Sequence, residues 1–182
     1  MVAAAALAVG KMLIVDGYNV LRSGDFYSNV RSQMPDYGDE AFNSAREALI
    51  NDVAAFAGSE YRSLIVFDGA GNSHSDGQVI SYGSVEAIFS RAGVSADSVI
   101  EKQARQASER GLEVLVVTSD ASTQWTVMGG SITRMSASGF YSELKALRAE
   151  ANSPSSQVAY KNTLGERIPQ EVLEELRRRF GI

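Results

Sequence analysis

The 182-residue sequence contains no cysteine and only three prolines. Without cysteine, the chain has no disulfide framework, no thiolate metal site and no cysteine nucleophile. A lack of disulfides is compatible with a reducing compartment, and we expect a cytoplasmic protein.

Positive charge is also scarce. The chain has 17 Lys and Arg against 22 Asp and Glu, which leaves a net charge of −5. A protein with this balance does not bind nucleic acid through bulk electrostatics. If it acts on nucleic acid, it needs a local basic patch, a metal ion or a basic partner.

Long apolar runs are missing as well. The most apolar segment, residues 1–11 (MVAAAALAVGK), is short and has no basic residue before its apolar run. A membrane span needs roughly 20 apolar residues, and a signal peptide needs a positively charged start. We therefore predict no membrane segment, and we expect residues 1–11 to be a disordered N-terminal extension.

Apolar strands alternate with amphipathic helices in the rest of the chain. The strands are predicted at 12–15, 63–67, 85–89, 113–118 and 132–135, and the helices at 40–57, 96–110, 121–128, 137–150 and 169–180. The runs at 12–15, 63–67 and 113–118 are apolar on both faces, which is typical of buried parallel strands. The alternation predicts one α/β domain with a mainly parallel sheet. Residues 151–182 are expected to form a linker and a C-terminal helix.

The three best strands all end in aspartate, at Asp16, Asp68 and Asp120. The carboxyl ends of parallel strands meet at one edge of a sheet, where α/β proteins bind ligands. Carboxylates gathered there repel one another unless a cation neutralises them, and a site made only of oxygens suits Mg²⁺ or Mn²⁺. A single aspartate after a strand is usually a turn residue or a helix cap, so the prediction depends on the coincidence of three.

Two acidic residues lie near the start of the predicted helix 96–110. Asp97 and Glu101 are four residues apart and share one helix face, so they could extend the acidic cluster. Equally, Asp97 could simply interact with the helix dipole and Glu101 could be a solvated charge.

Missing motifs exclude several phosphate chemistries. A phosphatase of the haloacid dehalogenase type needs Asp-x-Asp after its first strand, where this chain has Asp16-Gly17-Tyr18. A P-loop and a dinucleotide-binding fingerprint are absent. The single histidine, His74, excludes metal-free cleavage of RNA by two histidines. Metal-assisted hydrolysis of a phosphodiester is the chemistry that remains.

Four sequence blocks together resemble the NYN domain, and specifically the YacP-like ribonucleases. They are residues 13–20 (LIVDGYNV), 65–69 (IVFDG), 95–101 (SADSVIE) and 117–120 (VTSD), with Gln124-Trp125 downstream. The family helix often begins Thr-Ala-Asp, and the serine found here retains the capping hydroxyl. The resemblance covers about residues 12–150 and implies a nuclease domain with a PIN-like fold, a three-layer α/β/α arrangement around a mainly parallel central sheet.

The same resemblance implies a metal-dependent endoribonuclease. By motif matching, Asp16, Asp97 and Asp120 would be catalytic carboxylates that coordinate Mg²⁺ or Mn²⁺. Some YacP-like members are tied to mRNA cleavage on translating ribosomes, so mRNA and the ribosome are the implied partners. The alternative is a non-catalytic RNA- or ribosome-binding module with a vestigial acidic site.

Further residues are expected to assist these carboxylates or the substrate. The supporting residues are Asn19, Asp68, Glu101 and Ser119, and the expected RNA contacts among the few basic residues are Arg22 and Arg134. Asn19 could orient Asp16 or contact a phosphate. Ser119 could hold Asp120 through a hydrogen bond, or could simply cap the helix that follows.

Overall fold

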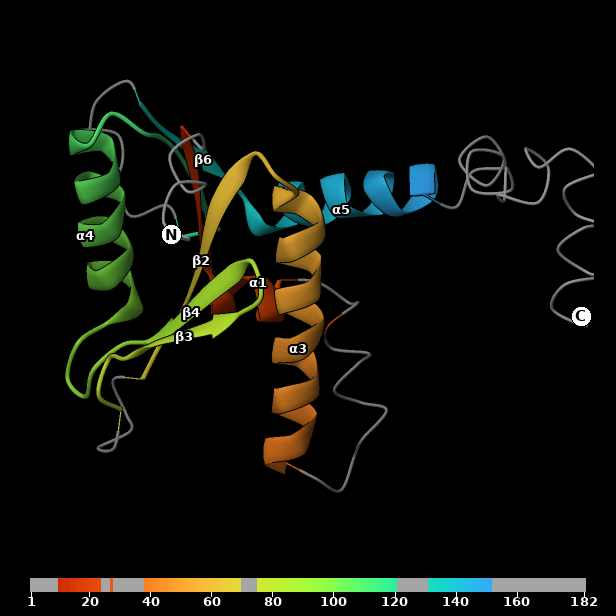
Figure 1. Ribbon diagram of the computed structural model, residues 1–182. Helices are drawn as coiled ribbons and strands as arrows, with labels where there is room; N and C mark the ends of the chain where they lie inside the picture. The colour runs from red at the N-terminus through yellow and green to blue at the C-terminus, as the bar shows by residue number, and fades with distance from the viewer. Residues whose placement is uncertain (1–9, 24–26, 28–37, 70–74, 121–130, 152–182) are drawn as a thin grey trace, which may run out of the picture. The chain divides into compact units, whose positions relative to one another are not determined.

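The computed structural model describes residues 10–23, 27, 38–69, 75–120 and 131–151 (Figure 1). The helices predicted at 121–128 and 169–180 lie outside this part of the chain, as do residues 1–9. The chain divides into two compact units, residues 1–144 and 145–182. Everything below concerns the first unit, apart from the end of the helix that continues to Ala151.

The described residues form one six-stranded sheet and four helices. The strands are β1 (Lys11–Asp16), β2 (Tyr61–Phe67), β3 (Val79–Tyr82), β4 (Val85–Phe89), β5 (Glu113–Val117) and β6 (Ile132–Met135). The helices are α1 (Gly17–Arg22), α3 (Gly38–Ala57), α4 (Ala96–Glu109) and α5 (Ala137–Ala151).

The strand order β3-β4-β2-β1-β5-β6 places β1 in the middle of the sheet. β1 pairs in parallel with β2 on one side and with β5 on the other, and β4 and β6 extend the parallel sheet. This confirms the predicted α/β fold with a mainly parallel sheet. Among the strands of the described ranges, only β3 runs antiparallel, as an edge strand beside β4.

Helices cover both faces of the sheet, which gives three layers (Figure 1). Leu13 and Val15 of β1 face a core that includes side chains of α1, α3 and α5 up to Leu144. Ile14 points to the opposite face, where α4 packs through its small and apolar residues. Successive residues of a strand point to opposite faces, so a central strand apolar at every position is buried by both layers.

None of the helices in the described ranges combines the length and the apolar character that crossing a membrane requires.

Candidate active site

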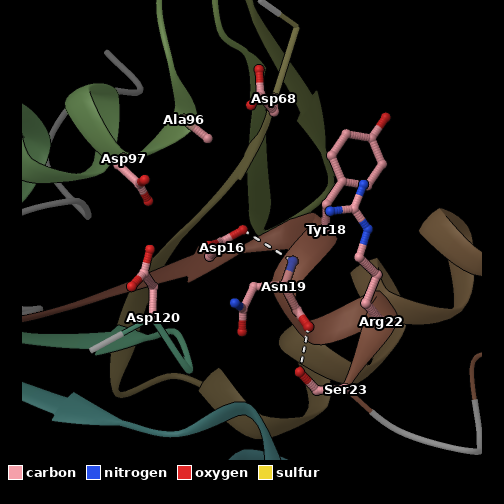
Figure 2. Close-up of a pocket in the computed structure, with 9 residues that line it drawn as sticks. All are labelled: Asp16, Tyr18, Asn19, Arg22, Ser23, Asp68, Ala96, Asp97 and Asp120. Carbon is pink, nitrogen blue, oxygen red and sulfur yellow. Dashed lines mark hydrogen bonds between the residues drawn. The ribbon is translucent and has the colours of Figure 1, made fainter. Parts of the chain in front are cut away.

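A cavity of about 240 Å³ opens at the carboxyl end of β1 (Figure 2). Nine described residues line it: Asp16, Tyr18, Asn19, Arg22, Ser23, Asp68, Ala96, Asp97 and Asp120. Four of them are aspartates, and they come from the ends of β1, β2 and β5 and from the first turn of α4. We refer to this cavity as the acidic pocket.

Asp16 is the buried member of this group, with 9% of its surface exposed. It is the N-cap of α1, where its carboxylate accepts a hydrogen bond from the Asn19 N–H at 3.1 Å. It also accepts one from the Thr118 hydroxyl at 3.2 Å. Burial raises the pKa of Asp16 most; these two hydrogen bonds lower it, and the charges of Asp97 and Asp120 raise it further.

Asp97 reaches the pocket from the start of α4. Ser95 caps this helix by accepting a hydrogen bond from the Ser98 N–H, which places Asp97 in the first turn. Its pKa is raised, mainly by burial and then by the charges of Asp120 and Asp68. The charges of neighbouring aspartates therefore disfavour the ionised forms of Asp16 and Asp97.

Thr118 joins the ends of β1 and β5. Its hydroxyl donates to Asp16 and accepts from the backbone N–H of Asp120 at 3.1 Å, and the residue is only 1% exposed. Arg134 on β6 donates to the carbonyl oxygen of Asp120 at 2.8 Å. The backbone of Asp120 is thus held on both sides, and Arg134, which was expected to contact RNA, uses part of its guanidinium for this.

A second link lies beside Thr118. The Ser119 N–H donates to the side-chain oxygen of Asn19 at 2.8 Å, across 100 residues of sequence. The Ser119 hydroxyl in turn accepts from the N–H of Ala137, the first residue of α5. Asn19 and Ser119 therefore connect α1, the end of β5 and the start of α5.

The structure brings together most, but not all, of the residues that the sequence suggested. Those that line the acidic pocket are Asp16, Asn19, Arg22, Asp68, Asp97 and Asp120. Ser119 and Arg134 lie behind the lining and bond to lining residues. Glu101 does not line the pocket; it forms an ion pair with Arg105 at 3.0 Å, one turn further along α4. Its supporting role stays a prediction.

Two residues of the site were not among the predicted site residues. Thr118 does not line the pocket, but its place between a buried strand and Asp120 does suggest a hydrogen bond that holds Asp120. Tyr18 lies inside the block 13–20 and lines the pocket, but its sequence position does not distinguish a core ring from a ligand contact.

A YacP-like NYN domain model matches residues 13–180. The chain belongs to the YacP-like NYN domain family. The YacP protein of Bacillus subtilis (strain 168) is 26% identical over 165 residues, which cover 90% of this chain and 92% of that protein. The crystal structure of Rae1 (YacP) from Bacillus subtilis is similar, with a TM-score of 0.63 and 27% identity over 94% of this chain and 96% of that chain. The structure of a Rae1 point mutant gives a TM-score of 0.61 and 26% identity over 86% and 89% of the two chains.

These matches confirm the family resemblance and the PIN-like fold expected from the sequence. They also place the chain in a nuclease-type family with an RNA-related function. NYN nuclease domains generally use divalent metal ions.

The donor set of the acidic pocket fits such an ion. All four acidic side chains offer oxygen, the ligand that Mg²⁺ and Mn²⁺ prefer. Among the described residues, no group of three or more acidic or histidine side chains is placed to hold a metal ion. Mg²⁺ often binds through one or two carboxylates and keeps several water ligands, so it does not require three converging protein ligands.

Proposed function

We propose that this protein is a divalent-metal-dependent endoribonuclease that hydrolyses phosphodiester bonds of RNA. The observation that carries the proposal is the meeting of four carboxylates, from three strand ends and one helix start, in a single pocket of a nuclease-family fold. The nuclease domain is proposed to span residues 12–150.

Asp16, Asp97 and Asp120 are the proposed metal-holding and catalytic carboxylates. Asp16 is buried and accepts two hydrogen bonds, whereas Asp97 and Asp120 are exposed at the pocket surface. A bound Mg²⁺ or Mn²⁺ would activate a water molecule and stabilise the leaving oxygen. Since burial and neighbouring charges raise the pKa of both Asp16 and Asp97, a cation here would relieve a repulsion that the fold itself leaves in place.

The residues around these carboxylates are proposed to hold their geometry. Thr118 ties Asp16 to the backbone of Asp120, and Asn19 ties the start of α1 to Ser119. A catalytic group misplaced by about 1 Å can lose on the order of 100-fold in rate. Rigid links of this kind are what a phosphodiester hydrolase needs at its site.

The proposed substrate is mRNA on the translating ribosome, in the cytoplasm. The acidic pocket and the net charge of −5 both repel free RNA. A larger partner that presents the RNA would overcome this repulsion, and the YacP-like resemblance makes the ribosome our choice.

The test is cleavage of one labelled mRNA with and without translating ribosomes, in Mg²⁺, by the full chain. We expect the wild type to cut the translated mRNA and the Asp97→Asn protein to be slower by at least about 100-fold. Glu109→Gln, a neutralised carboxylate at the other end of α4, is the matched control and should cut like the wild type. Equal rates for Asp97→Asn and the wild type would overturn the site assignment. Binding of ribosomes or RNA with no cleavage by the wild type would identify a binding module instead.

A further inference from the structure

Tyr18 is the aromatic residue of the acidic pocket. It lies two residues after Asp16, in the first turn of α1, and its side chain is half-buried. Figure 2 shows Asp97 and Asp120 on one side of the pocket and Tyr18 with Arg22 on the other. An aromatic ring therefore faces the same space as the carboxylates, at the opposite wall.

The ring of Tyr18 is held in one orientation by its neighbours. Its edge packs on Phe67, with the ring centroids 5.3 Å apart and an interplanar angle of 61°. Its hydroxyl accepts a hydrogen bond from the guanidinium of Arg46 on α3 at 3.1 Å. A ring fixed in this way loses little conformational freedom when a ligand stacks on it.

Arg46 is itself fixed by aromatic rings. Its guanidinium carbon lies 5.9 Å from the ring centroids of Tyr18 and Phe67 and 5.4 Å from that of Phe89. These distances are within the range of cation–π attraction. Arg46 does not line the acidic pocket, but it contacts the lining residue Tyr18.

Arg22 completes the wall. Its guanidinium lies over the Tyr18 ring, 5.7 Å from the centroid, and the residue is exposed. Of the nine described residues that line the acidic pocket, Arg22 alone carries a positive charge. For an RNA strand that places a phosphate near the carboxylates, the positive charge that attracts it therefore lies at this wall.

We propose that Tyr18 and Arg22 form a stacking site for the nucleobase next to the scissile phosphate, and that Arg46 is a positioning residue for Tyr18. The proposal rests on the proposed endoribonuclease function and narrows its substrate to single-stranded RNA with an unstacked base at the cut. Aromatic rings and guanidinium planes stack on any base, since every base has a π-face. The site therefore gives affinity with little base preference.

Fluorescence of 2-aminopurine placed beside the expected cut tests the stacking directly. The full-length Asp97→Asn protein serves as the background, so that the RNA stays intact during the titration. Because free RNA is expected to bind weakly, the titration is carried to roughly 10⁻⁴ M protein. We expect the fluorescence to be quenched on binding, and the quenching to be lost with Tyr18→Leu and kept with Tyr18→Phe. Tyr82→Leu, at an exposed tyrosine of β3 outside the pocket, is the matched control and should quench fully. Equal quenching by Tyr18→Leu and the control would overturn the stacking site.

Steady-state cleavage separates this proposal from the function on which it rests. Tyr18→Leu is expected to raise KM about tenfold with little change in kcat, because stacking on one base contributes binding rather than chemistry. Arg22→Gln, at an exposed position, should raise KM without disturbing the core. Arg46→Lys loses the planar fork and should raise KM less than Tyr18→Leu does.

Three results would distinguish failure of the proposed endoribonuclease function from failure of the stacking site. If Asp97→Asn cleaves normally, the proposed function fails, whatever the tyrosine variants do. If Asp97→Asn is inactive while Tyr18→Leu and Arg22→Gln keep the wild-type KM, only the stacking site fails. A loss confined to kcat in both variants would also overturn it, because that pattern marks a role in the chemistry or the fold rather than in base binding.

Discussion

The two ends of the central strands differ in how their charged side chains are arranged. At the amino end of β1, Lys11 forms an ion pair with Glu60 at 3.5 Å and lies 5.7 Å from the centroid of the Tyr61 ring. At the carboxyl end of the same strand, Asp16 shares a pocket with three other aspartates. Opposite charges meet at one end, and like charges meet at the other.

Cavity size does not explain why the carboxyl end is the candidate site. A cavity of about 400 Å³ at the amino end is lined by Lys11, Glu113 and neighbouring strand residues, and it is larger than the acidic pocket of about 240 Å³. What differs is that the acidic pocket keeps aspartates together, where burial and the charges of neighbouring aspartates raise the pKa of Asp16 and Asp97. A fold that retains such repulsion gives up stability, which is typical of a functional site.

The largest expected effect comes from adding metal, which would remove the repulsion between the carboxylates of the acidic pocket. Filling the acidic pocket stabilises the folded state, by about 2.7 kcal/mol when Mg²⁺ is at one hundred times its dissociation constant. Thermal unfolding of the full chain in rising Mg²⁺, at constant ionic strength, measures this. We expect the melting temperature of the wild type and of Glu109→Gln to rise, and that of Asp97→Asn to rise much less. An unchanged wild type at millimolar Mg²⁺ or Mn²⁺ would contradict a metal site.

The next largest effect is expected from a steric change at the carboxyl end of β1. A Cβ atom added at Gly17 would lie 2.4 Å from two ring carbons of Phe67, too close for any side chain there. Gly17→Ala is expected to destabilise the fold by about 2 kcal/mol, as overpacking of a core does.

Gly10, at the amino end of β1, is the matched control for Gly17. A Cβ there would meet no atom within 4 Å, so Gly10→Ala should change the free energy of unfolding by less than about 0.5 kcal/mol. Urea denaturation measures both variants. Equal stability of the two would show that the Phe67 ring can move aside.

Loss of the link between the two strand ends should be smaller still. Thr118→Val keeps the shape of the side chain but removes the donor to Asp16 and the acceptor for the Asp120 N–H. We expect the cleavage rate to fall about tenfold, as for residues that orient catalytic ligands. Thr133→Val, at an exposed position of β6, is the control. Wild-type rates for Thr118→Val would show that the carboxylates hold their places without it.

The smallest effects are expected from removing a single charge at either end of the central strands. Both changes are measured in metal-free buffer. Because the pKa of Asp97 is raised in the folded protein, its ionised form costs stability. Asp97→Asn should therefore match the wild type well below pH 3.8, the ordinary pKa, and become more stable as pH rises through the raised value. At neutral pH we expect a gain of about 2 °C in melting temperature, small because Asp97 is exposed.

Glu60→Gln makes the corresponding change at the amino end. It removes one partner of an exposed ion pair, so the free energy of unfolding should change by less than about 0.5 kcal/mol, in the destabilising direction. Thermal melts from pH 3 to pH 8 measure both variants. Destabilisation by Asp97→Asn at neutral pH would mark Asp97 as a structural hydrogen-bond acceptor.

Much of the carboxyl edge was predictable because strand periodicity is local. A run such as 12–15, apolar at every position, indicates a strand buried on both faces, and the aspartate after it then falls at the ligand-binding edge. The edge strand β3 and the short helix α1 were missed. β3 has four residues and α1 has six, so each is too short to show a clear strand or helix period in the sequence.

By itself, the sequence determined the α/β class, the family and the acidic character of the site, since each depends on residue types at short spacings. Only the tertiary structure decided which of the candidates share a pocket. Glu101 is four residues from Asp97, yet it pairs with Arg105, whereas Asp16 and Thr118 meet across 102 residues. The cluster of Arg46 with the Tyr18 ring depends on how α3 packs against the sheet, and no local pattern encodes that packing.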